Sequence, residues 1–231
     1  MRLIAAPGDG RVQRAIANSY VHIIVDILLD TSDRELLTLV ARLLKKYTQR
    51  AQTGLEEALR SIRKNQRHFT QEGYTIPAHI LALTDAIHQL YQQSESEIRF
   101  LRGAIVELLA FELVHPRYRP GECLSNQRFL DAQGRTVTDQ VDVAALSHER
   151  HELEGYECKI KVDGIESSDC TSLSYLFDVS QNWDFRASVG IVTFDEDLQM
   201  KRKLERLNPA SCIHLYGLDS VFTLQYTPFA S

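Results

Sequence analysis

Residues 153–162 read Leu-Glu-Gly-Tyr-Glu-Cys-Lys-Ile-Lys-Val, and this stretch decides how the second half of the chain is expected to fold. Polar and apolar residues alternate in it, as they do in a β-strand with one buried face. Tyr156 and Cys158 fall on the apolar face, whereas Glu157 and Lys159 fall on the other. The stretch predicts a strand over residues 152–162 that presents a carboxylate and an ammonium group on one side. An exposed strand with an ordinary ion pair is the plainer interpretation.

A second strand is predicted over residues 140–147, where Asp142 stands between two valines. Aspartate is depleted from strands, so an Asp in this position either faces water or is held by a partner such as a metal ion. The polar residues 148–151 are typical of a hairpin loop. The two strands are therefore expected to pair antiparallel, with Asp142 close to Glu157. Two converging carboxylates repel each other unless a cation lies between them.

Further helices and strands are expected around this hairpin. A capping box of Ser94 and Glu97 opens a helix that runs to about Val114. The other elements are predicted at residues 123–130 (strand), 168–182 (helix), 188–194 (strand), 197–206 (helix) and 213–216 (strand). Three consecutive strands followed by alternating helices and strands predict an α/β domain over residues 94–231 with a mixed central sheet.

Residues 1–93 are expected to form a separate, all-helical N-terminal region. Apolar residues recur at helical spacing over residues 11–29 and again from residue 36 to about residue 64. Ser32 and Glu35 have the spacing of a capping box for the second of these helices, which Gly54 is expected to interrupt. A third helix is expected from Pro77 to Tyr91.

Glu107 is unusual within the helix predicted up to Val114. Its neighbours three and four residues away are Gly103, Ala104, Ala110 and Phe111, which form a small apolar face. A glutamate on such a face either extends its carboxylate to solvent or points into a functional cleft. Glu107 is therefore a third candidate acid.

The order of a Glu on a helix, Val-Asp-Val on a strand and Glu-Cys-Lys on the next strand resembles the PD-(D/E)xK nuclease superfamily. The resemblance covers about residues 94–216 and is carried by residues 102–107, 140–143 and 156–159. It implies a restriction-endonuclease-like αβββαβ core with a mixed central sheet. No proline precedes Asp142, which departs from the motif in its fullest form.

The resemblance implies a phosphodiesterase that uses Mg²⁺ or Mn²⁺, and more specifically a DNA endonuclease of restriction, phage defence or repair. Asp142, Glu157 and the backbone carbonyl of Cys158 are expected to hold the metal ion, with Glu107 completing the acidic cluster. The ion is expected to polarise the scissile phosphate and to lower the pKa of the attacking water. Lys159 is expected to position or activate that water and to offset the developing negative charge.

Additional residues are candidates for binding the substrate. Gln140 shares the strand face of Asp142, and Lys161 follows Lys159 on its face. Arg117 and Arg119 flank Tyr118 in a basic loop that is suited to holding a nucleic-acid backbone. Solvent-exposed polar groups, and a charged loop at a helix end, are the plainer interpretations of these residues.

The composition limits these expectations. A net charge of −5 over 231 residues gives no overall attraction to nucleic acid, although basic residues near an acidic site still hold phosphates. No apolar run is long enough to span a membrane, and the first residues do not read as a secretory signal. The four cysteines lack metal-binding or disulfide spacing, so reduced thiols and a cytoplasmic location are expected.

Two other interpretations remain open from the sequence. A catalytically inactive nuclease-fold protein would bind nucleic acid or a protein partner without cutting. In an unrelated α/β protein, the three acids would be ordinary surface groups pointing to different surfaces. For a nuclease, the expected partners are nucleic acid, more specifically DNA, and a second copy or a partner subunit that binds through the N-terminal helices.

Overall fold

The computed structural model describes the chain except for residues 7–9, 50–53, 71–72, 139, 208–210 and 230–231. The chain divides into two compact units. Met1–Asp9 and Leu109–Ser231 form the sheet unit, and Gly10–Leu108 form the helical unit. Within the described residues, no helix is both long enough and apolar enough to cross a membrane.

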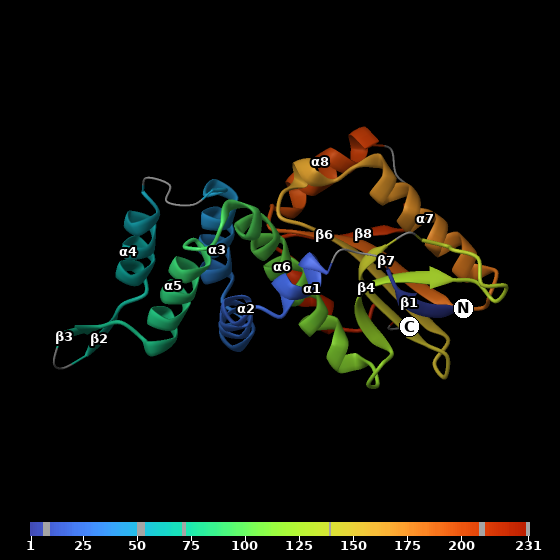
Figure 1. Ribbon diagram of the computed structural model, residues 1–231, viewed down its shortest axis with the longest axis horizontal. Coiled ribbons are helices and arrows are strands. Elements are labelled where there is room, and N and C mark those ends of the chain that lie inside the picture. Colours follow the sequence, from blue (N-terminus) through green and yellow to red (C-terminus); the bar gives the residue numbers. More distant parts are fainter. Residues whose placement is uncertain (7–9, 50–53, 71–72, 139, 208–210, 230–231) are drawn as a thin grey trace. The chain divides into compact units, whose positions relative to one another are not determined.

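The sheet unit is built on one six-stranded mixed sheet (Figure 1). Its strands lie in the order β1 (Arg2–Ala5), β4 (Cys123–Leu130), β5 (Val141–Ser147), β6 (Glu152–Lys159), β7 (Arg186–Thr193) and β8 (Ile213–Tyr216). Neighbouring strands among β1, β4, β5 and β6 pair antiparallel. Strands β6, β7 and β8 run parallel. The mixed α/β class expected from the sequence is therefore confirmed.

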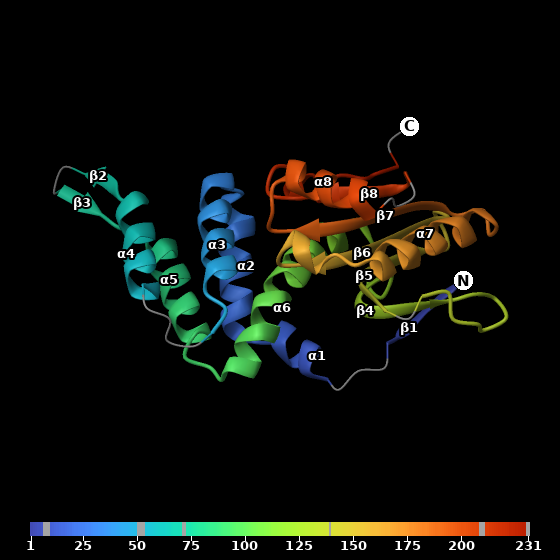
Figure 2. The ribbon, with the colours of Figure 1, turned by 90° about the horizontal axis from the view of Figure 1, so that it is seen from above.

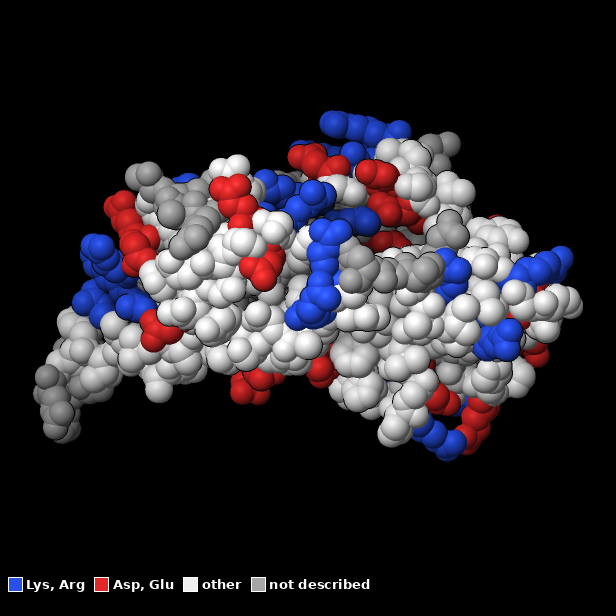
Figure 3. All heavy atoms as spheres, in the orientation of Figure 1, with Lys and Arg blue, Asp and Glu red and all other residues white. Residues whose placement is uncertain are grey.

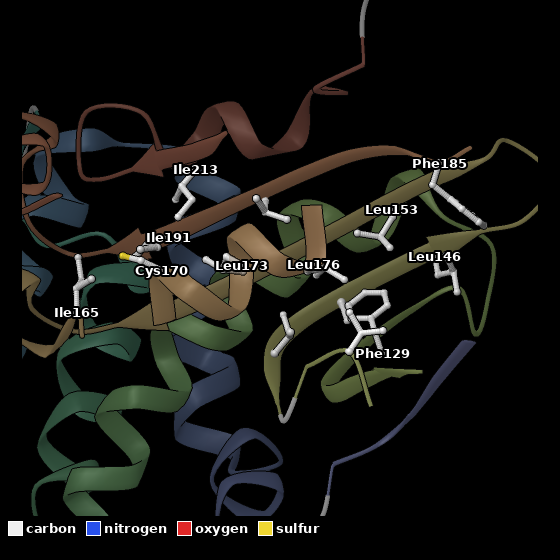
Figure 4. Packing of buried hydrophobic residues seen from close by; sticks show 14 of the residues in the cluster. Phe129, Leu146, Leu153, Ile165, Cys170, Leu173, Leu176, Phe185, Ile191 and Ile213 are labelled. Atoms are coloured by element: carbon white, nitrogen blue, oxygen red, sulfur yellow. The ribbon is translucent and has the colours of Figure 1, made fainter. Parts of the chain in front are cut away.

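Two helices supply the connections between the parallel strands. Helix α7 (Ser167–Gln181) packs on β6 and β7, and α8 (Asp197–Leu207) packs against β8. Leu173 and Leu176 of α7 lie in the apolar core shown in Figure 4, together with Phe129 and Leu153 of the sheet. Gly155 permits the close approach of α7, because a Cβ atom there would lie 2.8 Å from Cδ2 of Leu176.

Short 3-10 helices lie in two connections of the sheet unit and after β8. They are η1 (His115–Arg117), η2 (Val162–Gly164) and η3 (Val221–Gln225). Helix α6 (Glu95–Val114) opens at the expected capping box, because the Ser94 hydroxyl accepts a hydrogen bond from the Glu97 backbone N–H and the Ser94 backbone N–H donates to the Glu97 carboxylate. The element order α-β-β-β-α-β-α-β from residue 94 onward is thus confirmed.

Among its described residues, the helical unit also contains five shorter helices and one hairpin (Figure 2). The elements are α1 (Arg11–Ile16), α2 (Ser19–Thr31), α3 (Arg34–Lys46), α4 (Leu55–Asn65), α5 (Ala78–Leu90), and strands β2 (His68–Thr70) and β3 (Gly73–Thr75). Helix α5 packs against both α2 and α4. Two long-range hydrogen bonds fix the end of α3: the Tyr91 hydroxyl donates to the Tyr47 carbonyl at 2.6 Å, and Arg102 Nε donates to the Leu44 carbonyl at 2.7 Å.

Several sequence expectations for residues 1–93 were wrong. The region is not all helical, since β1 pairs with β4 in the sheet unit and β2 pairs with β3. The division of the chain also differs from the expected boundary at residues 93 and 94, because residues 1–9 belong with the sheet and the first part of α6 belongs with the helices. An edge strand of four residues depends on its neighbour for its backbone hydrogen bonds, so local periodicity does not reveal it.

The helix boundaries differ for identifiable reasons. Residues 11–29 form two helices, because the Asn18 side chain accepts a hydrogen bond from the Tyr20 N–H and starts α2. Asp33 caps α3 in place of Ser32, and its carboxylate accepts from the N–H groups of Glu35 and Leu36. Ser32 instead ends α2 with a positive φ of 45°.

Strand β6 is shorter than the strand predicted over residues 152–162. It ends at Lys159, which pairs with Thr193, the last residue of β7. Lys161 therefore lies beyond the strand, where it is exposed and precedes η2. Lys161 does not share a strand face with Lys159.

Candidate active site

Strands β5 and β6 bring two acids face to face. Val143 pairs with Tyr156 in the antiparallel register, so Asp142 lies opposite Glu157. Both acids lie on the sheet face covered by α7, because Gly155, two residues before Glu157, points at Leu176 of that helix. Their relative exposures are only 9% for Asp142 and 7% for Glu157. These are therefore buried carboxylates and not ordinary surface groups.

Asp142 is held by hydrogen bonds from two directions. Its Oδ2 accepts from the Cys158 backbone N–H at 2.8 Å, and the Gln140 side chain also donates to the carboxylate. Gln140 Nε2 in turn donates to Oδ1 of Asn126 at 2.9 Å. Burial raises the pKa of Asp142, although the Cys158 N–H acts in the opposite direction.

Glu157 has the more strongly perturbed carboxyl group. Burial raises its pKa well above the usual range, and repulsion from Asp142 adds to the shift, although the Lys159 ammonium opposes it. Both shifts favour the protonated forms of these carboxyl groups. In the absence of a cation, the pair is therefore stabilised by holding a proton.

Lys159 lies against this pair with its side chain 28% exposed. Its Nζ is 3.4 Å from Oε2 of Glu157 and 3.1 Å from Oδ1 of Asp169. Burial lowers the pKa of Lys159, but the charges of Glu157, Asp142 and Asp169 outweigh this effect and raise it. Lys159 is consequently held as an ammonium ion.

Helix α7 contributes Asp169, which the sequence interpretation missed. Asp169 occupies the third position of the helix and forms a capping box with Glu166, whose backbone N–H donates to Oδ2 at 2.8 Å. The spacing of Glu166 and Asp169 is a visible signal for a helix start. It does not indicate that the packed helix brings the second oxygen of Asp169 to Lys159, and the role of Asn126 beside Gln140 was equally hidden.

The donor atoms at the acid pair fit a hard divalent cation. Two buried carboxylates that repel each other gain more from a cation than from a proton at neutral pH. Cys158 offers only its backbone carbonyl, because its side chain alternates to the opposite sheet face. Within the described residues, no group of three or more His, Cys, Asp and Glu side chains is arranged to hold a metal ion. A cation held by the two carboxylates would therefore need backbone oxygen and water as its remaining ligands.

Glu107 belongs to the helical unit and is half-buried on α6. Gly103 lies one turn earlier, and a Cβ atom there would be 3.8 Å from Oε1 of Glu107, an ordinary van der Waals distance. Participation of Glu107 in the acidic cluster stays a prediction.

Comparison with known proteins adds little beyond this geometry. No family model and no curated protein matches the chain. Among solved structures, the chain is similar to the small subunit (R.BspD6I2) of the heterodimeric restriction endonuclease R.BspD6I, with 12% sequence identity and a TM-score of 0.33. The match covers 58% of this chain and 70% of that chain. A function must therefore be argued from the residues of the site.

The expected substrate-binding role of Arg117 is not supported. Its guanidinium forms an ion pair with Glu154 and donates to the carbonyls of Leu224 and Tyr226. Glu154 is 1% exposed and also accepts from the hydroxyls of Tyr118 and Tyr156. By strand alternation, this network lies on the sheet face opposite Glu157.

The other two basic candidates are also away from the acid pair. Arg119 is paired with Glu149 near the hairpin loop, with 71% of its side chain exposed. Lys161 lies outside β6, as described above. Of the residues predicted to bind substrate, only Gln140 is in contact with the acid pair.

We expect Arg117→Ala to destabilise the fold and not to act specifically on substrate binding. The change leaves Glu154 buried without its counter-charge, which costs about 3–5 kcal/mol of unfolding free energy. Urea denaturation should show this loss, whereas Arg119→Ala should cost less than about 1 kcal/mol because its ion pair is exposed. An Arg117→Ala protein of wild-type stability would contradict this structural role.

Proposed function

We propose that this chain is a metal-dependent phosphodiesterase that cleaves nucleic acid, with a restriction-endonuclease-like core and a PD-(D/E)xK site. The more specific form of the proposal is a DNA endonuclease. The observation that supports it is the buried pair of Asp142 and Glu157 on adjacent strands, with the Lys159 ammonium against it. Burial of two like charges is costly unless a cation compensates for them.

Each residue has a role that follows from its surroundings. Asp142 and Glu157 would hold Mg²⁺ or Mn²⁺, together with the Cys158 carbonyl. When bound, such an ion supplies Lewis-acid polarisation of a phosphate oxygen and lowers the pKa of water. Gln140 and the Cys158 N–H keep Asp142 oriented. Lys159, held as an ammonium ion, would offset negative charge that develops on the phosphate in the transition state.

The net charge of the chain gives no overall attraction to nucleic acid. On the face shown in Figure 3, acidic and basic side chains are interspersed, in keeping with the net charge of −5. Non-specific attraction to phosphates is therefore expected to be weak. Productive binding must depend on the cation and on groups close to the site.

The test is a cleavage assay with the purified full chain. Supercoiled plasmid, linear duplex, single-stranded DNA and RNA would each be incubated in Mg²⁺, Mn²⁺ or EDTA, beside an Asp142→Asn protein. Cleavage that requires the metal and disappears in the variant is the expected result. Absence of cleavage for every substrate and metal, while a folded protein is verified by circular dichroism, would count against the proposal.

A further inference from the structure

A shallow groove of about 480 Å³ lies between helix α7 and residues 136–138. Every lining side chain except Val137 carries a hydroxyl group; these are Thr136, Thr138, Ser168, Thr171, Ser172 and Tyr175. None of these lining residues, all of which the structure describes, is charged. The groove is therefore rich in hydrogen-bonding groups but electrically neutral.

Each wall of the groove contains a residue that is close in the sequence to a residue of the candidate site. On α7, Ser168 directly precedes Asp169, which contacts Lys159 at 3.1 Å. On the other wall, Thr138 lies two residues before Gln140, which hydrogen-bonds to Asp142. A chain lying in the groove would therefore reach the acid pair and the lysine at one end.

The α7 wall follows directly from helical spacing. Residues 168, 171, 172 and 175 recur at three- and four-residue intervals and share one helix face. Residues 170, 173 and 176 occupy another face and pack in the apolar core. The sequence therefore places hydroxyl groups along α7 without interrupting its packing on the sheet.

Some of the hydroxyls are engaged within the protein, but others are available to a ligand. Thr138 accepts a hydrogen bond from the Phe129 N–H, and Thr171 donates to the Ser167 carbonyl. Within the described part of the chain, the hydroxyls of Thr136, Ser172 and Tyr175 have no protein partner. Tyr175 is also 53% exposed, which is a large exposure for an aromatic residue on a helix packed against the sheet.

We propose that this groove binds single-stranded nucleic acid, with Tyr175 stacking on an unpaired base and the hydroxyl groups contacting the phosphates. The inference rests on the proposed function and names its substrate class. An exposed aromatic ring can stack on a base only when that base is unpaired, because bases within a duplex are already stacked on each other. Hydroxyl side chains are common hydrogen-bond donors to phosphates, and this groove offers several of them.

Direct binding would test this assignment by fluorescence anisotropy. The probes are a fluorescein-labelled phosphorothioate 20-mer, chosen to resist cleavage, and the same sequence as a duplex, both in Mg²⁺. The wild-type full chain is expected to bind the single strand more tightly. Tyr175→Ala should weaken that binding about 10-fold, whereas Tyr175→Phe should preserve it, because the ring and not the hydroxyl stacks.

Tyr226→Ala is the matched control, because Tyr226 is 66% exposed in the same unit and does not line the groove. Its binding should equal that of the wild type. A second expectation concerns salt: between 50 and 200 mM, single-strand affinity should fall much less than the roughly 10³–10⁵-fold of a protein with many phosphate ion pairs. Equal binding by Tyr175→Ala and Tyr226→Ala, or tighter binding of the duplex, would overturn the assignment.

The outcomes also separate this inference from the proposed function. Metal-dependent cleavage by the wild type, combined with unaltered single-strand binding by Tyr175→Ala, would support the proposed nuclease site and overturn the proposal that the groove binds single strands. Tyr175-dependent binding of single strands without cleavage in any metal would support the groove and count against the nuclease.

Discussion

Replacing Lys159 by alanine is expected to lower the rate of metal-dependent cleavage about 10³-fold. Its Nζ lies 3.4 Å from Glu157 and 3.1 Å from Asp169, so the ammonium is held at the acid pair before substrate arrives. A charge that is already in position stabilises the transition state without further reorganisation of the site. Initial rates with Mg²⁺ at saturating substrate would measure the loss.

Lys161→Ala provides a matched control for this prediction. Lys161 is exposed, lies just beyond β6 and is two residues from Lys159 in the sequence. Its replacement is expected to leave the cleavage rate unchanged. Circular dichroism of both variants would verify folding, because Lys159→Ala also removes a counter-charge from buried acids. Equal cleavage rates for Lys159→Ala and the wild type would contradict the proposed role of Lys159 in catalysis.

Glu157→Gln is expected to act in opposite directions on two properties. It should abolish cleavage, since the change removes a metal ligand, and it should stabilise the metal-free protein at neutral pH. Burial and Asp142 raise the pKa of Glu157 in the folded protein. The folded state therefore binds a proton more tightly than the unfolded state, in which the pKa is about 4.3.

The sign of the pH dependence follows from this difference. The protonated Glu157 carboxyl group makes its full contribution to the free energy of unfolding at pH values below its pKa in the unfolded state. This contribution is lost as the pH rises through the higher pKa of Glu157 in the folded state. In EDTA, the wild type should lose stability from about pH 5 upward, whereas the glutamine variant should lose less because that group cannot ionise. Melting temperatures measured from pH 5 to pH 8 would show whether the two curves diverge.

Adding Mg²⁺ should make the wild type more stable than the Glu157→Gln protein, the reverse of their order in EDTA. At a Mg²⁺ concentration of 100 times Kd, the wild type gains about 2.7 kcal/mol of unfolding free energy, and the variant should gain much less. Glu149→Gln is a suitable control, because Glu149 is 61% exposed and should respond to neither pH nor metal in this way. A glutamine variant that is less stable than the wild type in EDTA at pH 8 would contradict the perturbed state of Glu157.

The strands of the sheet unit were largely predictable because their signals are local. Residues 123–130 and 213–216 form strands with the predicted bounds, and residues 148–151 form the predicted turn. Turn residues mark the limits of these strands, such as Gly121 before the first and Gly217 after the second. Edge strand β1 has no turn residues before it, and β2 and β3 have only three residues each, so they were missed.

The candidate site was only partly predictable. Asp142 stood out because an Asp between two valines is unusual in a strand, and Glu157 and Lys159 because they share one strand face. Asp169 did not stand out, since a serine- and aspartate-rich helix start is common. The ion pair of Arg117 with Glu154 was not predictable, because a basic loop has the same sequence whether its guanidinium faces solvent or a buried glutamate.

The sequence by itself determined the mixed α/β class, the pairing of β5 with β6 and the opposition of Asp142 and Glu157. All three follow from residue alternation and a short turn, which act over neighbouring residues. Only the tertiary structure decided that α7 brings Asp169 to Lys159, that Arg117 pairs with Glu154 and that hydroxyl groups form a groove between α7 and residues 136–138. These contacts join residues far apart in the chain, and packing of a helix against a sheet sets their distances, which no local pattern encodes.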